Sequence, residues 1–433
     1  MRVILILFSF LLVGKVGICQ IGQPKVPQYQ DVQPVAGANS NLTTGQSQQS
    51  IHPPQRNSKQ EKELKQLQKD IRETKQKYPE QKIPDNEKSY YSALAELNKM
   101  AVNINNFSIT EATYIVENAY YNNKYPKSNY DNSIKARVEL CKQILKKEHL
   151  SESNNLALNY AIQKLYQQDN KYYNPRTKQN TIIPRLKYDF DDWHGDTAYS
   201  QMFVSKIFAT NKGQCHSLPR LYLILAEKLG AKAFLSNAPE HNFIQFTDTL
   251  GHLYNFETTS GVLVSDKFMM QSGFISTAAI KSKIYLDTLS KEQMLALCYV
   301  DLANEYVSKF TYTPFVEQLA QKAVQLDPNC IQAHMLLSIV EEVKLEYYAQ
   351  KLGCTKLEDI PKYPQLKAYY DEREKQYGII DGLGYQQMPK DAYTDWLKSV
   401  EHEKTKQEAE EMQQQVNYQL QFSKVKISTT TKR

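Results

Sequence analysis

Between residues 213 and 257 the apolar residues change from a helical period to an alternating one. Leu218, Leu221 and Leu225 recur at helical spacing, and Gly230 is well placed to end that helix. The stretch HNFIQFTDTLGHLYNFET then alternates apolar and polar residues, which is typical of two strands joined at a turn in DTLG. Because both periods occur in close succession, we expect an α+β fold in which this helix packs on an antiparallel sheet.

Cys215 lies at the N-terminal end of the predicted helix. Pro219 is tolerated only in the first turn of a helix, so the helix should begin near Ser217. The positive end of a helix dipole stabilises a thiolate, and thiols at such positions have lowered pKa values. Gly213 lets backbone approach closely just before the cysteine. These features make Cys215 a candidate nucleophile.

His241 opens the alternating stretch and is the candidate base. If residues 248–250 form a three-residue loop, Thr247 pairs with Gly251, and the same register sets His241 directly opposite Glu257. Cross-strand neighbours have Cβ atoms about 4.5–5.5 Å apart, so the carboxylate could orient the imidazole while the other ring nitrogen faces the thiol. A register slip of one residue would turn Glu257 to the other face.

Other interpretations of these residues stay open. Cys215 could be an inert core thiol, because free cysteines are often buried. We expect His216 to be a neighbour in the helix turn rather than the base, and His252 to cap a strand at the surface. A zinc site built from His194, Cys215, His216 and His241 has poor spacing, since cysteine and histidine are adjacent and no CxxC pair is present. We expect no metal and no organic cofactor.

The order of cysteine, histidine and acid, with spacings of 26 and 16 residues, resembles the transglutaminase-like (papain-like) cysteine enzyme superfamily. The resemblance covers roughly residues 185–285. YDFDDWHGD, GQCHSLPRLYLILAEKLGAKA and YNFETTSG also resemble a set of exported bacterial proteins with such a domain. It implies Cys215 as nucleophile, His241 as base and Glu257 as third member, although aspartate is the common third residue.

The oxyanion hole has no clear side-chain donor in the sequence. No glutamine lies about six residues before Cys215, where papain-type enzymes carry one. Gln214 and Trp193 are side-chain candidates, and the backbone N–H of Cys215 is the preferred donor.

The 433 residues suffice for two or three domains. We divide the chain as follows: 1–19 signal peptide, 20–58 disordered linker, 59–180 helical N-terminal region, 181–285 transglutaminase-like core, 286–350 tetratricopeptide-like helices, and 351–433 helical, partly disordered tail. The predicted signal peptide indicates an exported, periplasmic or extracellular protein. No later apolar run reaches 18 residues, so we expect no integral membrane segment after signal cleavage. Lipid anchoring at Cys19 is the alternative.

Helical periodicity or charge pattern predicts helices in both flanking regions. The predicted ranges are 60–77, 89–104, 108–123, 133–150, 152–168, 197–209, 290–310, 314–326, 330–353 and 392–420. Residues 320–340 resemble the join between two tetratricopeptide repeats, with Ala323 followed by Asp-Pro at 327–328. An ordinary helical bundle explains them nearly as well. If the repeat interpretation holds, these helices contact a peptide or protein partner.

Charge and cysteine content limit the partners. The net charge is +6, with basic and acidic residues interleaved, so nucleic acid is not an expected partner. Six cysteines become five if Cys19 leaves with the signal peptide. That odd number in an exported protein would leave at least one thiol unpaired, which fits a reactive Cys215.

The sequence thus predicts thiol-dependent acyl chemistry on an amide or peptide substrate. The enzyme would be a cysteine peptidase or amidase, or a transglutaminase-like acyltransferase, acting through Cys215, His241 and Glu257. The alternative is a non-catalytic binding or scaffold protein with a papain-like core and partner-binding helices.

Overall fold

The computed structural model describes residues 84–386, except 176, 190–191, 193–194, 196–197, 249 and 273–274. Four predictions lie outside this part: the signal peptide at 1–19, the linker at 20–58 and the helices at 60–77 and 392–420. Within the described part the fold is α+β, as the change of hydrophobic period predicted.

Within the described residues, four helices form the N-terminal region, as predicted. They are α2 (Lys88–Val102), α3 (Ile109–Tyr120), α4 (Lys127–Lys147) and α5 (Asn155–Gln167), with a short 3₁₀ turn η1 (Ile104–Asn106). The Ser108 hydroxyl accepts a hydrogen bond from the Glu111 backbone N–H at 3.3 Å and so caps the N-terminus of α3. α4 begins at Lys127 rather than at Ser133, because the buried Tyr130 adds an apolar turn.

Residues 170–213 contain a hairpin and a short pair of parallel strands. The hairpin consists of β1 (Asn170–Asn174) and β2 (Gln179–Ile183). β3 (Lys187–Tyr188) pairs in parallel with β4 (Lys212–Gly213). The helix predicted at 197–209 is divided into η2 (Tyr199–Met202) and α6 (Val204–Thr210).

The main sheet has four antiparallel strands in the order β5-β6-β7-β8. They are β5 (Ala233–Ala238), β6 (His241–Thr247), β7 (Leu253–Glu257) and β8 (Val262–Val264). α7 (Ser217–Leu229) starts and stops where the sequence predicts, and Gly230 ends it with a φ of 76°. Leu221 of α7 belongs to the same buried cluster as Ile244 and Phe256 of the sheet.

Helices resume after the sheet. They are α8 (Asp266–Ser272), α9 (Thr277–Lys281), α10 (Lys291–Lys309), α11 (Pro314–Leu326), α12 (Ile331–Leu352), η3 (Leu357–Lys362) and α13 (Pro364–Gly382). α10, α11 and α12 match the predictions at 290–310, 314–326 and 330–353. Ser290 and Gln293 form a reciprocal capping box that begins α10.

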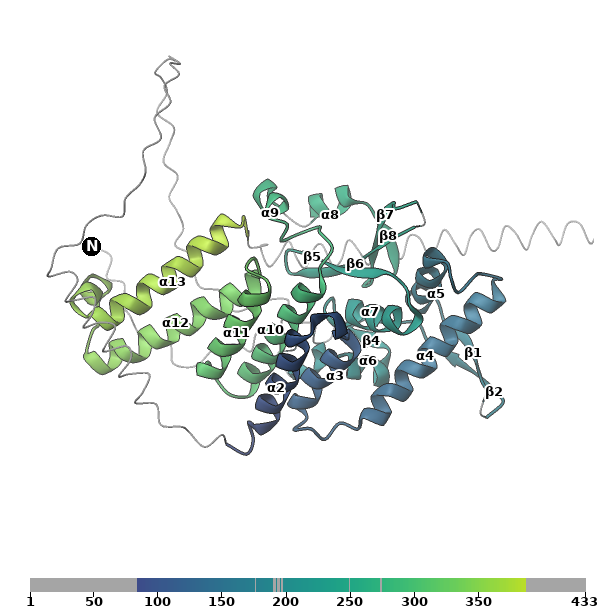
Figure 1. Ribbon diagram of the computed structural model, residues 1–433, viewed down its shortest axis with the longest axis horizontal. Coiled ribbons are helices and arrows are strands. Elements are labelled where there is room, and N and C mark those ends of the chain that lie inside the picture. Colours follow the sequence, from purple (N-terminus) through teal and green to yellow (C-terminus); the bar gives the residue numbers. More distant parts are fainter. Residues whose placement is uncertain are drawn as a thin grey trace, which may run out of the picture.

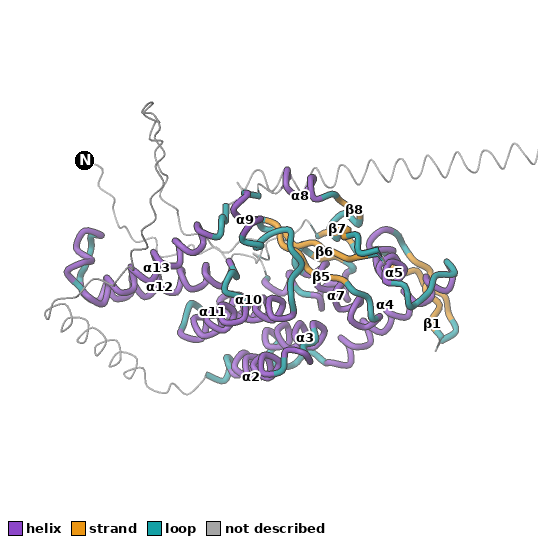
Figure 2. The backbone as a smooth tube through the Cα atoms, turned by 45° about the horizontal axis from the view of Figure 1, so that its top comes forward, coloured by secondary structure: helices purple, strands orange, loops and turns teal. Residues whose placement is uncertain are grey.

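One hydrophobic cluster joins α2 to α7, β5 to β7, and α10 to α12. α7 lies near its middle, with α4 and α5 on one side, α10 and α11 on the other, and the sheet above it (Figures 1 and 2). Every residue of α7 from Ser217 to Ala226 is buried. The helix that follows Cys215 is therefore held by the N-terminal helices, the sheet and the helices α10 and α11. These three regions share a core although they are far apart in sequence.

Among the residues that the structure describes, no helix is both long enough and apolar enough to cross a membrane.

Candidate active site

The turn before α7 is held by backbone pairing on its N-terminal side. Asp189 donates its N–H to the carbonyl of Gly213 at 2.9 Å, next to the parallel pairing of β3 with β4. A Cβ on Gly213 would lie 2.7 Å from Ile207 Cδ1 and 3.0 Å from Ser217 Oγ. The close backbone approach predicted for Gly213 is confirmed, and it brings the turn directly onto α6.

Cys215 itself is fully buried just before α7. The Ser217 hydroxyl accepts the N–H of Gln214 at 3.0 Å, and the Gln214 carbonyl accepts the N–H of Leu218 at 2.9 Å. These two bonds make residues 214–217 a turn that leads into α7. The Cys215 Sγ therefore lies at the N-terminal end of α7, where backbone N–H groups favour negative charge.

The β5–β6 hairpin carries the candidate base and contacts this sulfur through its turn. Its two-residue turn is Pro239–Glu240, because Ala238 pairs with His241. Glu240 has a φ of 54°, a left-handed conformation that costs a non-glycine residue on the order of 1–3 kcal/mol. The Glu240 carbonyl oxygen lies 3.9 Å from the Cys215 Sγ. The residue directly before His241 thus contacts the cysteine.

His241 and Glu257 form a buried pair. His241 Nε2 lies 2.6 Å from Glu257 Oε2, and neither residue is more than 4% exposed. The other carboxylate oxygen, Oε1, accepts the backbone N–H of Thr259 at 2.9 Å and its hydroxyl at 2.8 Å. With Glu257 ionised, Nε2 donates the proton, and Nδ1 is then the nitrogen able to accept one. This pairing is the one that the alternation of the sequence predicted.

The strand register behind this pairing differs from the prediction. Thr247 pairs with Leu253 rather than with Gly251, so the loop covers residues 248–252 and not 248–250. The Asp248 carboxylate accepts the N–H groups of Leu250 at 2.8 Å and His252 at 2.9 Å, which stabilises the longer loop.

A slip of two residues keeps every side chain on its predicted face. The observed register, continued by one residue, sets Glu257 opposite Phe243 and diagonal to His241. Long side chains reach diagonal neighbours, so the pair survives the change. On the same face Gln245 donates to Asn255 at 3.0 Å. His252 is exposed and lies 2.9 Å from Asp248 in the loop.

The structure differs from the expected number of free thiols. Cys215 is disulfide-bonded, so the expectation that it would be the unpaired thiol does not hold in this structure. Cys141, Cys298, Cys330 and Cys354 are free. Burial raises the pKa of Cys298 to about 11, that of Cys330 to about 12, and that of Cys141 well above its usual range. Those three thiols have little thiolate at neutral pH.

A buried charge cluster lies behind the cysteine-bearing turn, and the sequence interpretation missed it. His216 Nε2 lies 3.1 Å from Asp301 Oδ1, and Arg220 forms an ion pair with the other oxygen of Asp301. Burial alone would raise the pKa of Asp301, but the charges of Arg220 and His216 outweigh it and lower that pKa. His216 is thus paired with Asp301, which agrees with the expectation that it is not the base. The available signal was a charged residue inside an apolar helix, in CYVDLANEY and LPRLYLIL.

Two buried glutamates extend this cluster. Glu117 of α3 accepts the N–H groups of Val204 at 2.6 Å and Ser205 at 3.0 Å. Burial raises its pKa to about 7 despite those bonds. Burial, followed by the nearby charges of Glu117 and Asp301, raises the pKa of Glu305 well above its usual range. The region beneath the turn therefore holds carboxyl groups that favour protonation.

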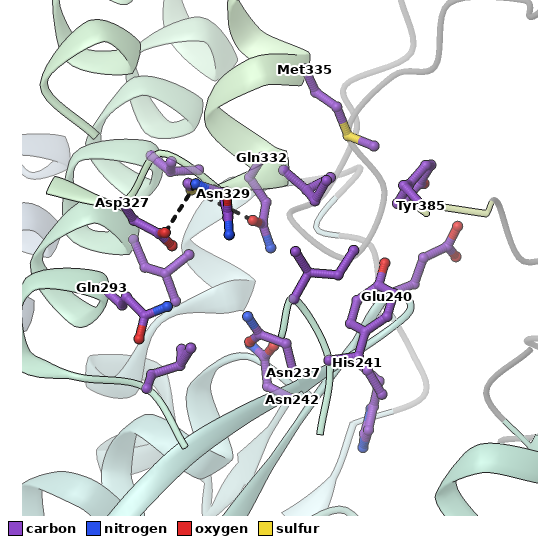
Figure 3. Close-up of a pocket in the computed structure, with 18 of the residues that line it drawn as sticks. Asn237, Glu240, His241, Asn242, Gln293, Asp327, Asn329, Gln332, Met335 and Tyr385 are labelled. Atoms are coloured by element: carbon purple, nitrogen blue, oxygen red, sulfur yellow. Dashed lines mark hydrogen bonds between the residues drawn. The ribbon is translucent and has the colours of Figure 1, made fainter. Parts of the chain in front are cut away.

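A cleft opens beside His241, between the β5–β6 hairpin and the turn that joins α11 to α12 (Figure 3). Asn237 and Asn242 line the hairpin side, and Asn329 and Gln332 line the helix side. In Figure 3 these carboxamides point toward one another from the two walls. The cleft thus connects the His241 side of the site to the helices with the repeat-like sequence.

The oxyanion candidates have separate outcomes. Gln214 is buried, and its amide nitrogen donates to the Asp192 carbonyl at 3.2 Å, so this donor is already engaged. Trp193 lies outside the described residues. The backbone N–H of Cys215 stays the expected donor.

Metal ligation is limited by the histidine pairs. His216 and His241 are each held by a carboxylate, and His194 of the weighed zinc set lies outside the described residues. Among the residues described, no group of three or more His, Cys, Asp or Glu side chains is arranged to hold a metal ion.

Comparison with known proteins gives no assignment. The chain matches no family model, and neither curated proteins nor solved structures match it. Any role for this site therefore rests on its geometry and its residue chemistry.

Proposed function

We propose that the reduced protein catalyses acyl chemistry on an amide or peptide through Cys215, His241 and Glu257. The observation that carries the proposal is the buried 2.6 Å pair between His241 and Glu257, beside a cysteine at a helix N-terminus. A histidine oriented by a carboxylate next to a thiol is the arrangement of nucleophile, base and orienter. The α7 helix against an antiparallel sheet supports a papain-like or transglutaminase-like core.

The proton transfers balance within these residues. His241 Nδ1 takes the proton of the Cys215 thiol, and the thiolate attacks the amide carbonyl carbon. The C–N bond then breaks, His241 returns the proton to the leaving nitrogen, and a thioester remains on Cys215. Water or an amine attacks the thioester and regenerates the thiol. Glu257 holds Nε2–H throughout and stabilises the imidazolium.

A second candidate function is a binding protein without catalysis. Cys215, His241 and Glu257 are all buried, and Cys215 is disulfide-bonded, which favours a structural role. In that case the helices α11 and α12 and the cleft beside them would carry the function.

Reduction followed by alkylation separates the two candidates. A nucleophilic Cys215 should be alkylated by iodoacetamide at neutral pH faster than Cys141, Cys298 and Cys330, and Cys354 serves as the accessible reference. Mass spectrometry of timed samples gives the rate for each thiol. Labelling of Cys215 no faster than that of the three buried thiols would contradict the enzyme.

Two substitutions then separate chemistry from folding. Cys215→Ser removes the thiol with little change of volume, and His241→Gln keeps a donor for Glu257 but cannot take a proton. We expect both variants to keep the melting temperature within a few degrees and to lose cysteine-dependent cleavage or amine transfer on a peptide pool. Their combined effect should equal either single effect, because the two groups act as one unit. A Cys215→Ser variant with full activity would exclude the mechanism.

A further inference from the structure

The two walls of the cleft beside His241 both carry carboxamide side chains. Asn237 and Asn242 are directly paired across β5 and β6, so two carboxamides stand side by side on the hairpin. Asn329 of the α11–α12 turn and Gln332 of α12 face them (Figure 3), and the Asn329 Nδ2 also donates to the Ser282 carbonyl at 3.3 Å. A carboxamide both donates and accepts hydrogen bonds, as a peptide group does. Four of them on opposite walls match a ligand that presents amides along its length.

The charges of the cleft argue against an anionic ligand. Arg220 at its floor is already paired with Asp301, which leaves Lys283 as the cation without such a buried partner among the lining residues. Glu240 and Asp327 also line the cleft. Phosphate and nucleotide sites need several positively charged side chains that can bind the anion, and the lining of this cleft lacks them. An uncharged backbone fits better.

Strand addition is not the mode of binding on the β5 side. Leu286 donates its N–H to the Asn237 carbonyl at 3.0 Å, and Leu289 donates to the Leu235 carbonyl at 2.9 Å. The outer edge of β5 is thus already paired by the chain itself. A ligand in the cleft has to be held by side chains rather than by a backbone ladder.

The far end of the cleft is apolar. Ile331 and Met335 of α12 are buried there, and Tyr385 lies beside Met335 (Figure 3). Methionine side chains adapt to ligands of different shape. This end would take an apolar side chain while the carboxamides hold the neighbouring amides.

We propose that the cleft binds an extended polypeptide segment, with Asn237, Asn242, Asn329 and Gln332 holding its backbone amides and Met335 contacting an apolar side chain. Binding of this segment does not depend on the function proposed above. The role of the segment as the substrate delivered to Cys215 rests on the function proposed above.

A displayed library of random dodecapeptides, selected on purified protein carrying Cys215→Ser, tests the binding. Selected peptides should share an apolar residue, and Asn242→Ala or Gln332→Ala should each raise the Kd about threefold to tenfold, as loss of one hydrogen bond implies. Gln350→Ala, on the exposed part of α12 outside the cleft, is the matched control and should leave the Kd unchanged. Peptides N-methylated at single backbone positions should bind several-fold more weakly at the positions that the carboxamides hold.

Several outcomes would overturn the inference. They are a Kd insensitive to both cleft substitutions, no penalty from N-methylation at any position, and retention of an oligosaccharide from a glycan array with no peptide selected. Binding as described, combined with an unreactive reduced Cys215, would uphold the cleft and reject the enzyme. Cysteine-dependent turnover with an unchanged KM in Asn242→Ala and Gln332→Ala would uphold the enzyme and reject the cleft.

Discussion

Glu257 is the residue whose contacts most restrict the proposed chemistry. One carboxylate oxygen is occupied by two donors of Thr259, and the other faces His241 Nε2. A carboxylate can accept all three hydrogen bonds because it has only acceptors. The Glu257 carboxylate therefore sets both the tautomer and the orientation of the His241 imidazole. Glutamate fills this role here, although aspartate is the common choice in the family that the sequence resembles.

Glu257→Gln should lower kcat/KM by about 10²- to 10⁴-fold while the protein stays folded. With the amide oxygen held by Thr259, the Gln amide nitrogen would donate to His241 Nε2. The ring proton would then move to Nδ1, which could no longer accept the thiol proton. The pH dependence of Cys215 alkylation in reduced protein gives a readout that needs no substrate, and it should shift to higher pH.

Thr259→Val is the control for this substitution. It removes one of the three hydrogen bonds to Glu257 and leaves the backbone N–H bond in place, so a loss of only about twofold to tenfold is expected. Alkylation and turnover of Glu257→Gln equal to those of the parent would show that Glu257 has no part in activating the cysteine.

Among the elements, the segment from α6 through β4 to α7 positions the cysteine. β4 is only two residues long, and it is held between the parallel β3 and the side chain of Ile207. Ile207 is fully buried, so it has no free space into which it can move. The turn at residues 213–215 thus depends on the absence of a side chain at Gly213.

Gly213→Ala should destabilise the protein by about 1–3 kcal/mol and reduce Cys215 alkylation, because the new methyl group would meet Ile207 at 2.7 Å. Ile207→Val in the same chain removes the nearest carbon and should restore part of both losses. Thermal unfolding and alkylation rates measure the two effects. Gly378→Ala in α13 meets nothing within 4 Å and should be neutral or slightly stabilising. Equal effects of the two alanine substitutions would refute this account of Gly213.

At the scale of the whole molecule, carboxylates join the N-terminal helices to the core. Glu227 of α7 accepts the backbone N–H of Ile109 at the start of α3, together with the hydroxyls of Ser108 and Thr110. Glu117 of α3 does the same at the start of α6. Each contact satisfies helix N-terminal N–H groups with a side chain distant in sequence. The N-terminal helices are thereby part of the unit that holds the site.

Glu117 should make stability depend on pH. Burial raises its native pKa to about 7 from an ordinary value of 4.5. Between these values the native state binds more protons than the unfolded state, so the free energy of unfolding falls as pH rises through this window. Subtracting the Glu117→Gln variant from the parent isolates the contribution. The parent's advantage should shrink by on the order of 1–3 kcal/mol from pH 4.5 to pH 7.

Urea unfolding of both proteins at several pH values measures that difference. The exposed Glu152→Gln is the matched control, and its difference from the parent should not vary with pH in this window. A difference between the parent and Glu117→Gln that is constant across the window would contradict the raised pKa of Glu117.

Local patterns were enough to predict most of the helices, the β6–β7 hairpin and part of the site. Helical spacing and capping residues determined the bounds of α7 and α11, since these signals act within a few residues. The alternation of apolar and polar residues placed His241 and Glu257 on one face. A loop that is longer by two residues does not change this, because a register shift of two residues leaves every side chain on the same face of the sheet. The loop length itself was predicted wrongly, because the hydrogen bonds of Asp248 decide it and periodicity does not report them.

Only the tertiary structure decided what surrounds the pair. The His216–Asp301 contact spans 85 positions, the Glu117–Val204 contact spans 87, and the carboxamide walls of the cleft come from the β5–β6 hairpin and the α11–α12 region. A charged residue inside an apolar helix indicates that it has a buried partner, but the sequence does not identify that partner. The packing of the helices determines which residue it is. The residues near Cys215 could be recognised in the sequence, whereas the environment that gives them a chemistry comes from the folded chain.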